Sequence, residues 1–205
     1  MEIIVGEYSG FCNGVRFTVE EAEKALKEDK TIYCLGEIVH NERVIEELER
    51  KGMKTISHIE EAPNHETVII RAHGEIKDTY DKAEEKGIEL LDLTCGKIKA
   101  IRIKISHQKE DSFIIIIGKK NHPETLGVQS FSGDDSYILE NREDIDECKE
   151  KYLTSKKNKI YIVSQTTFNS NKFDELVEQI KKQFKGEIIV DKTICDATSK
   201  RQEET

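Results

Sequence analysis

Three of the five cysteines stand where an α/β fold places reactive groups, between an apolar run and the start of a predicted helix. They are Cys12, Cys95 and Cys195. Backbone N–H groups and the helix dipole at such a position stabilise a thiolate or an anionic cluster. Three thiolates that converge on one point can hold an iron–sulfur cluster and leave one of its irons open for a substrate. The placement of these cysteines therefore indicates an iron–sulfur site.

The other two cysteines have simpler explanations, since a cysteine taken alone is more often a small buried apolar residue than a ligand. Cys34 lies inside the apolar run Ile-Tyr-Cys-Leu, and we expect it to be buried. Cys148 lies in a charged helical stretch, and we expect it on a helix face without chemistry. The chain contains no Cys-x-x-Cys pair, which argues against a zinc ribbon or a ferredoxin-type motif.

Three of the six histidines lie just beyond predicted strand ends, where open sheets bind ligands. They are His40, His73 and His122. A loop histidine usually makes a structural hydrogen bond. Three of them near helix starts, which favour anions, instead indicate a phosphate or diphosphate site. The remaining histidines lie in charged surroundings and are expected at the surface: His58, His65 and His107.

A carboxylate and a hydroxyl also lie just beyond the ends of predicted strands. Glu124 comes two residues after His122 and can deliver protons, or can simply complement the helix dipole in the first turn. Thr166 follows the strand that ends at Ser164 and can orient a carboxylate or a substrate hydroxyl, or can cap the next helix. Both residues are candidates for catalysis.

Short apolar runs alternate with charged, helix-period stretches. Strands are expected at Ile3–Gly6, Thr31–Gly36, Thr67–Arg71, Ile88–Asp92, Phe113–Gly118, Ser136–Leu139, Lys159–Ser164 and Glu187–Val190. Helices are expected at Val15–Glu28, Glu42–Lys51, Asp78–Lys86, Ile98–Lys109, Arg142–Tyr152 and Lys172–Phe184. This alternation predicts an α/β fold made of parallel sheets with crossover helices.

The order of apolar run, cysteine and helix start occurs three times, which suggests a repeated unit. We expect one α/β domain over residues 13–95 and a second over residues 96–194. Residues 1–12 and 195–205 are then expected to belong to a third domain.

Composition narrows the possible partners. Asp and Glu outnumber Lys and Arg by 41 to 32, and the net charge of −9 argues against sequence-independent nucleic-acid binding. No apolar run approaches the roughly 20 residues of a membrane span. The first residues read as a strand and not as a signal peptide, so we expect a cytoplasmic protein without a disulfide framework.

Seven motifs in order resemble those of the LytB family, the 4-hydroxy-3-methylbut-2-enyl diphosphate reductases of the non-mevalonate isoprenoid pathway. The motifs are Gly10–Val15, Ile38–Asn41, Arg71–Gly74, Asp92–Cys95, Gly118–Glu124, Ser164–Thr167 and Ile194–Thr198. Each motif is weak by itself, but their order is specific, and together they cover essentially the whole chain.

The resemblance implies three similar α/β domains around a central 4Fe-4S cluster. The cluster ligands that it implies are Cys12, Cys95 and Cys195. The substrate contacts that it implies are His40, His73, His122 and Thr166. The implied proton donor is Glu124, supported by Thr166. Two electrons from a ferredoxin or flavodoxin would remove the allylic hydroxyl of the diphosphate substrate as water, giving isopentenyl and dimethylallyl diphosphate.

The chain departs from the family pattern at two places. Gly96 stands where the family usually has a proline after its second cysteine, and a glycine loosens that turn. The sequence also stops at Thr205, whereas the family's third domain continues and supplies a Ser-x-Asn stretch and a later serine to the diphosphate. We therefore expect a truncated third domain. Two alternatives stay open: a truncated, non-catalytic iron–sulfur protein that binds a small anion, and a plain α/β ligand-binding domain.

Overall fold

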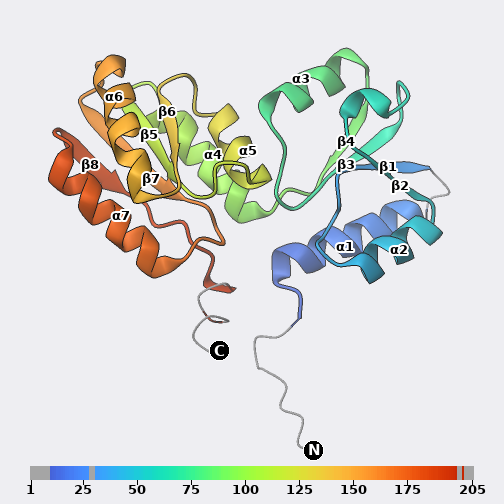
Figure 1. Ribbon diagram of the computed structural model, residues 1–205. Helices are drawn as coiled ribbons and strands as arrows, with labels where there is room; N and C mark the ends of the chain where they lie inside the picture. The colour runs from blue at the N-terminus through green and yellow to red at the C-terminus, as the bar shows by residue number, and fades with distance from the viewer. Residues whose placement is uncertain (1–9, 28–30, 198–199, 201–205) are drawn as a thin grey trace, which may run out of the picture. The chain divides into compact units, whose positions relative to one another are not determined.

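The computed structural model describes residues 10–27, 31–197 and 200, so the predicted strand Ile3–Gly6 lies outside the described residues. The chain forms two compact units (Figure 1). The first unit spans Phe11–Gly96, and the second includes Lys97 and the described residues that follow it. The expected assignment of residues 195–205 to a third domain stays a prediction.

The first unit is a four-stranded parallel sheet with helices on both faces. Its strands are β1 (Ile32–Leu35), β2 (Met53–Ile56), β3 (Thr67–Ile70) and β4 (Glu89–Asp92), in the order β2-β1-β3-β4. Its helical segments are α1 (Asn13–Leu26), α2 (Glu42–Arg50), the 3₁₀ turn η1 (Ile59–Glu61) and α3 (Lys77–Glu85). The carboxyl ends of the strands therefore all open on one edge, where parallel sheets bind ligands.

Alternate residues of β1 divide the core of the first unit between the two sheet faces. Ile32 and Cys34 pack with Ala22 of α1 and Leu48 of α2. Leu35 belongs to the cluster on the other face, together with residues of η1 and α3. Burial on both faces explains why this strand reads as a continuous apolar run.

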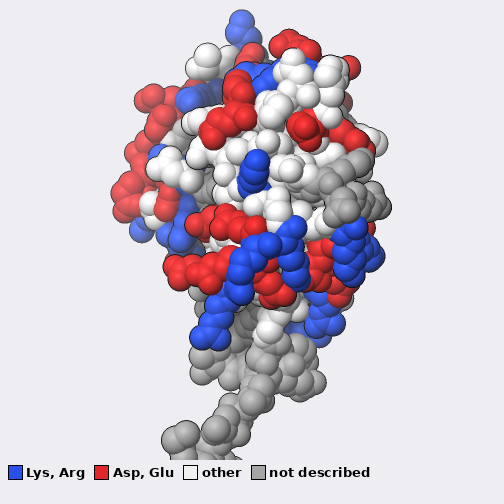
Figure 2. Space-filling view, turned by 90° about the vertical axis from the view of Figure 1, so that its right-hand side faces the viewer, with Lys and Arg blue, Asp and Glu red and all other residues white. Residues whose placement is uncertain are grey.

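Acidic and basic side chains are interspersed on the face of the molecule seen in Figure 2. In the first unit, the Lys51 ammonium lies 2.7 Å from Glu23 and 2.8 Å from Glu47. The Lys82 ammonium lies 2.8 Å from Asp78. Such exposed pairs contribute at most about 1 kcal/mol each. These two lysines are thus matched by nearby acids.

The second unit repeats the same topology. Its strands are β5 (Ser112–Ile117), β6 (Ser136–Leu139), β7 (Lys159–Ser164) and β8 (Glu187–Val190), in the parallel order β6-β5-β7-β8. Its helical segments are α4 (Gly96–Gln108), α5 (Pro123–Ser130), η2 (Arg142–Asp144), α6 (Ile145–Ser155) and α7 (Ser170–Gln183). Phe113, Ile115 and Ile117 of β5 pack against α6 and α7 on one face of the sheet.

Equivalent hydrogen bonds support this repeat. Gly36 directly follows β1, and its N–H donates to the carbonyl of Ile56 at 2.8 Å. Gly118 directly follows β5, and its N–H donates to the carbonyl of Leu139 at 3.1 Å. Both glycines therefore join the end of the central strand to the edge strand beside it.

The predicted α/β class with parallel sheets is confirmed, but two elements were missed. β2 is a four-residue edge strand whose two middle residues are exposed, so it carries too few apolar residues to be recognised. α5 contains a glycine and lacks a clear apolar face, although Pro123 at its start is a typical helix signal. The predicted helix at Arg142 begins as the 3₁₀ turn η2 and becomes helical at Ile145. None of the helices in the described part of the chain combines the length and apolarity needed to span a bilayer.

Candidate functional site

The first unit brings two of the three predicted cluster cysteines together. Cys12 is the N-cap residue of α1, and its carbonyl accepts the N–H of Arg16 at 2.9 Å. Cys95 lies in the turn after β4. A Cβ placed on Gly14 would stand 2.8 Å from the Cys95 sulfur and 4.0 Å from the Cys12 sulfur. The Cys95 sulfur therefore packs directly against Gly14, a close approach that a side chain at residue 14 would prevent.

A buried threonine connects the segments that carry these two cysteines. The Thr18 hydroxyl lies 3.2 Å from the carbonyl of Leu93, two residues before Cys95, and 3.0 Å from the carbonyl of Gly14. Thr18 is fully buried. The Cys95 N–H in turn donates to the carbonyl of Ala72 at 2.9 Å. The thiol pair is thus fixed by hydrogen bonds to α1 and to the end of β3.

Two predicted histidines meet beside the same sheet edge. His40 follows β1 and His73 follows β3, and these strands are neighbours. Their ring centroids lie 5.2 Å apart with the planes tilted by 38°. His40 is exposed, and its Nδ1 lies 3.4 Å from a carboxylate oxygen of Glu37. Two adjacent imidazoles at an open edge offer N–H donors to an anion.

The second unit holds the third cysteine against the end of β7. The Cys195 N–H donates to the carbonyl of Thr166 at 2.7 Å. The Thr193 hydroxyl accepts the N–H of Ser164 at 2.9 Å and lies 2.6 Å from the Ser164 carbonyl. The loop that carries Cys195 is therefore fixed to β7 at two points.

Glu124 is a buried carboxylate in direct contact with Thr166. It is 1% exposed. One carboxylate oxygen accepts the Thr166 N–H at 2.6 Å, and the other accepts the Thr166 hydroxyl at 2.9 Å. Desolvation raises the pKa of Glu124 above its usual value, and the two hydrogen bonds from Thr166 oppose that rise. A carboxyl group whose pKa is raised keeps its proton to higher pH than an exposed glutamate does, which suits a proton donor.

His122 caps the helix that carries this carboxylate. It is the N-cap residue of α5, and its Nδ1 accepts the Glu124 N–H at 3.1 Å. The Nδ1 atom is therefore the acceptor, and the other ring nitrogen carries the proton when the imidazole is neutral. The bond fixes the orientation of the imidazole at the start of α5.

Gln165 is a site residue that sequence reasoning did not single out. It is 4% exposed, and its side-chain oxygen accepts the Lys119 N–H at 3.0 Å. Its side-chain amide donates to the Thr167 hydroxyl at 2.9 Å. A Cβ on Gly118 would stand 2.8 Å from the Cβ of Gln165, so the glycine admits this close approach. An amide directly before Thr166, at the end of a buried strand, was the available signal.

The remaining cysteines and histidines behave as expected. Cys34 and Cys148 are fully buried, and desolvation raises the pKa of each thiol to about 12. They are therefore inert packing residues, although Cys148 lies in the core and not merely on a helix face. His58, His65 and His107 are exposed, as the sequence predicts.

The predicted site residues fall into two groups, one in each unit. Cys12, Cys95 and the pair of adjacent histidines belong to the first unit, whereas Cys195 and Glu124 belong to the second. Among the residues that the structure describes, no three His, Cys, Asp or Glu side chains are close enough to hold a metal ion.

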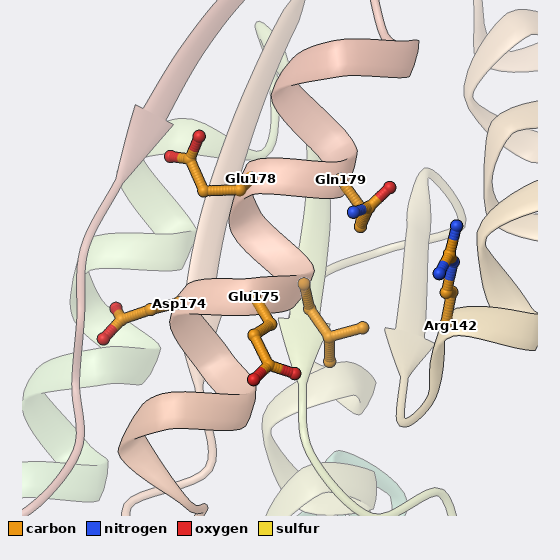
Figure 3. A pocket seen from close by; sticks show the side chains of 6 residues that line it. Arg142, Asp174, Glu175, Glu178 and Gln179 are labelled. Atoms are coloured by element: carbon orange, nitrogen blue, oxygen red, sulfur yellow. The ribbon is translucent and has the colours of Figure 1, made fainter.

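A groove of about 500 Å³ on the second unit is separate from these groups (Figure 3). Its lining residues are Arg142, Asp174, Glu175, Leu176, Glu178 and Gln179. Figure 3 shows Asp174 and Glu178 on the side of α7 away from Arg142. The groove contains none of the predicted site residues.

Comparisons with known proteins give a consistent result. The sequence profile described as "LytB protein" matches residues 3–205. A protein of Caldanaerobacter subterraneus subsp. tengcongensis, named 4-hydroxy-3-methylbut-2-enyl diphosphate reductase, is 37% identical over 210 residues, covering 99% of this chain and 70% of its own. A protein of the same name from Aquifex aeolicus is 36% identical over 208 residues, covering 99% of this chain and 69% of its own.

Solved structures agree with the sequence matches. A structure of (E)-4-hydroxy-3-methyl-but-2-enyl diphosphate reductase, described as the terminal enzyme of the non-mevalonate pathway, superposes with a TM-score of 0.83 and 36% identity. It covers 98% of this chain and 71% of that one. The Plasmodium falciparum reductase gives a TM-score of 0.86 and 32% identity, covering 95% of this chain and 61% of that one.

Proposed function

Because this chain belongs to the LytB protein family, we propose that it is a reductase of 4-hydroxy-3-methylbut-2-enyl diphosphate. The proposed products are isopentenyl and dimethylallyl diphosphate. The observation that carries the proposal is the contact between the buried Glu124 carboxylate and Thr166, whose carbonyl also accepts the Cys195 N–H. A proton donor is thereby held next to a candidate ligand of an iron–sulfur cluster.

The residues fit such a cluster. Thiolates are the ordinary protein ligands of iron–sulfur clusters, and the sulfurs of Cys12 and Cys95 both lie beside Gly14 in the first turn of α1. We assign the ligands to Cys12, Cys95 and Cys195. When bound, a 4Fe-4S cluster supplies electrons one at a time. The chemistry also needs reduced thiols, which supports a cytoplasmic location.

The reaction consumes two electrons and two protons. The allylic carbon–oxygen bond breaks, and the oxygen leaves as water after it takes one proton. The second proton adds to the allylic carbon skeleton, and its position of addition decides which of the two products forms. We propose a ferredoxin or flavodoxin as the one-electron donor, used twice per turnover.

Glu124 is the proposed source of protons. Its raised pKa keeps a proton available, and its contact with Thr166 fixes the orientation of both carboxylate oxygens. Thr166 has the second proposed role, since its hydroxyl can bond either the carboxylate or the substrate hydroxyl. Together they form a short proton path.

The three histidines are the proposed diphosphate contacts. His40 and His73 lie together at the edge of the first sheet, and His122 lies at the start of α5 in the second unit. Imidazole N–H groups bond phosphate oxygens, and more strongly when protonated. We therefore expect each of the three imidazoles to contribute to diphosphate binding.

Anaerobic turnover tests the proposal. The protein, reconstituted with iron and sulfide, is assayed with the diphosphate substrate and reduced methyl viologen as electron donor. Formation of both five-carbon diphosphates, dependent on iron, is the expected result. Bound iron without turnover would instead favour a non-catalytic cluster protein, and a chain that binds no iron would favour a plain ligand-binding domain.

A further inference from the structure

A lysine contacts the third candidate ligand within the second unit. Lys97 lies in the first turn of α4, and its ammonium is 3.2 Å from a carboxylate oxygen of Asp196. Burial lowers the pKa of Lys97, but hydrogen bonds and charge from Asp196 and the adjoining Cys195 raise it above its usual value. A cation and an anion therefore both lie beside this cysteine.

Stability does not explain the arrangement. The side chains of Lys97 and Asp196 are 46% and 81% exposed, and ion pairs this exposed contribute little to folding. Lysine is cationic at neutral pH and donates to sulfur, whereas it accepts no hydrogen bond. The Lys97–Asp196 pair is thus best explained by the electrostatic effect of its charges on the group that Cys195 binds.

We propose that Lys97 sets the reduction potential of the cluster held by Cys195, and that Asp196 offsets part of its charge. This inference rests on the proposed function. Lys97 belongs neither to the proton path nor to the diphosphate contacts, so it acts on electron transfer alone.

The direction of each effect follows from charge. Reduction adds negative charge to a cluster, and a nearby cation or an N–H donor to a ligand sulfur stabilises the reduced form. Removing the Lys97 ammonium therefore lowers the reduction potential. Removing the Asp196 carboxylate frees the ammonium to act on Cys195 and raises the potential.

The test is a potentiometric titration of the anaerobically reconstituted protein, followed by electron paramagnetic resonance. The variants are Lys97→Met, Lys97→Arg and Asp196→Asn, compared at equal iron content. Lys104→Met is the matched control, because Lys104 stands two turns further along α4 and pairs instead with Asp191 at 2.7 Å.

Lys97→Met is expected to lower the ratio of reduced to oxidised cluster at a fixed potential about tenfold, or about 59 mV for a one-electron couple. Asp196→Asn is expected to shift it in the opposite direction. Lys97→Arg and Lys104→Met are expected to stay close to the wild type. An unchanged potential in Lys97→Met, or equal shifts in Lys97→Met and Lys104→Met, would overturn the inference and leave the proposed function intact. A wild-type protein that holds no cluster would overturn both.

Discussion

The two units share one topology but prepare different chemistry at the same edge of the sheet. Ala72 and Thr166 occupy equivalent places, two residues after β3 and β7, and the carbonyl of each accepts a cysteine N–H. Thr166 adds a hydroxyl that bonds Glu124, whereas Ala72 ends in a methyl group. The first unit consequently presents thiols and imidazoles, and the second encloses a carboxylate.

The acids in equivalent helices show what that hydroxyl contributes. Glu42 begins α2 and is exposed, whereas Glu124 in the first turn of α5 is 1% exposed. A buried carboxylate needs donors to replace water, and Thr166 supplies two. A residue at the end of one strand thus supplies the donors for a buried acid in the helix that follows the neighbouring strand.

Replacing a proposed cluster ligand is expected to have the largest effect, which is the loss of bound iron. Replacing Cys12, Cys95 or Cys195 by serine should remove most of the bound iron, because a serine hydroxyl is a poor substitute for thiolate at iron. Cys34→Ser and Cys148→Ser serve as controls: both should lower stability, because both cysteines are fully buried, but should keep their iron per folded chain. Iron analysis of the purified, folded variants measures this, and equal losses in all five would refute the ligand assignment.

The carboxylate comparison predicts the next largest effect. Glu124→Gln should retain the cluster but lower kcat about 10²–10⁴-fold, because general acid catalysis contributes on that scale. Glu42→Gln, the matching change in the first unit, should alter kcat by less than about twofold, since an exposed acid transfers no proton to the site. Steady-state kinetics at equal iron content compares the two variants. A similar loss of kcat in Glu124→Gln and Glu42→Gln would show that the buried carboxylate has no special role in proton transfer.

The Thr166 hydroxyl should have a smaller effect with a distinct pH signature. Thr166→Val keeps the backbone N–H bond to Glu124 but removes the hydroxyl bond, which should cost roughly tenfold in kcat. Donors to a carboxylate lower its pKa, so losing one raises the pKa of Glu124 further above its usual value. The protonated donor then persists to higher pH, and the alkaline limb of the kcat profile should move upward. A limb that stays in place, or moves to lower pH, would contradict the role of Glu124.

The smallest expected effects come from the two threonines that fix the cysteine segments. Thr18→Val and Thr193→Val each remove a hydroxyl that bonds backbone groups, and each should lower the free energy of unfolding by about 1–2 kcal/mol. Urea denaturation of the iron-free chains measures this. If neither change lowers stability, these hydroxyls do not hold the loops.

The sequence alone was sufficient for the parts of the fold that carry long apolar runs. β5 and β7 are buried on nearly every residue, and both were predicted within one residue of their bounds. β2 was missed because an edge strand needs only two apolar residues, Met53 and Ile56, to pack. The conformation of β2 is determined by its pairing with β1 and not by the pattern of apolar residues in its own sequence.

The candidate site was predictable only where a residue type is chemically distinctive. Cysteine and histidine at strand ends are conspicuous, and Glu124 was proposed for the same reason. Thr18 and Gln165 could not be found that way, because threonine and glutamine are common in helices and loops and their roles depend on distant carbonyl and N–H partners. Such contacts appear only when the chain folds.

The central proposal is that Cys12, Cys95 and Cys195 bind one cluster through three thiolates and would leave one iron without a protein sulfur. The most direct measurement is the Mössbauer spectrum of the iron-57 reconstituted protein, recorded with and without the diphosphate substrate. We predict one iron site that differs from the others and that alone changes when substrate is added. A spectrum in which all irons are equivalent, and in which substrate changes none of them, would contradict the account.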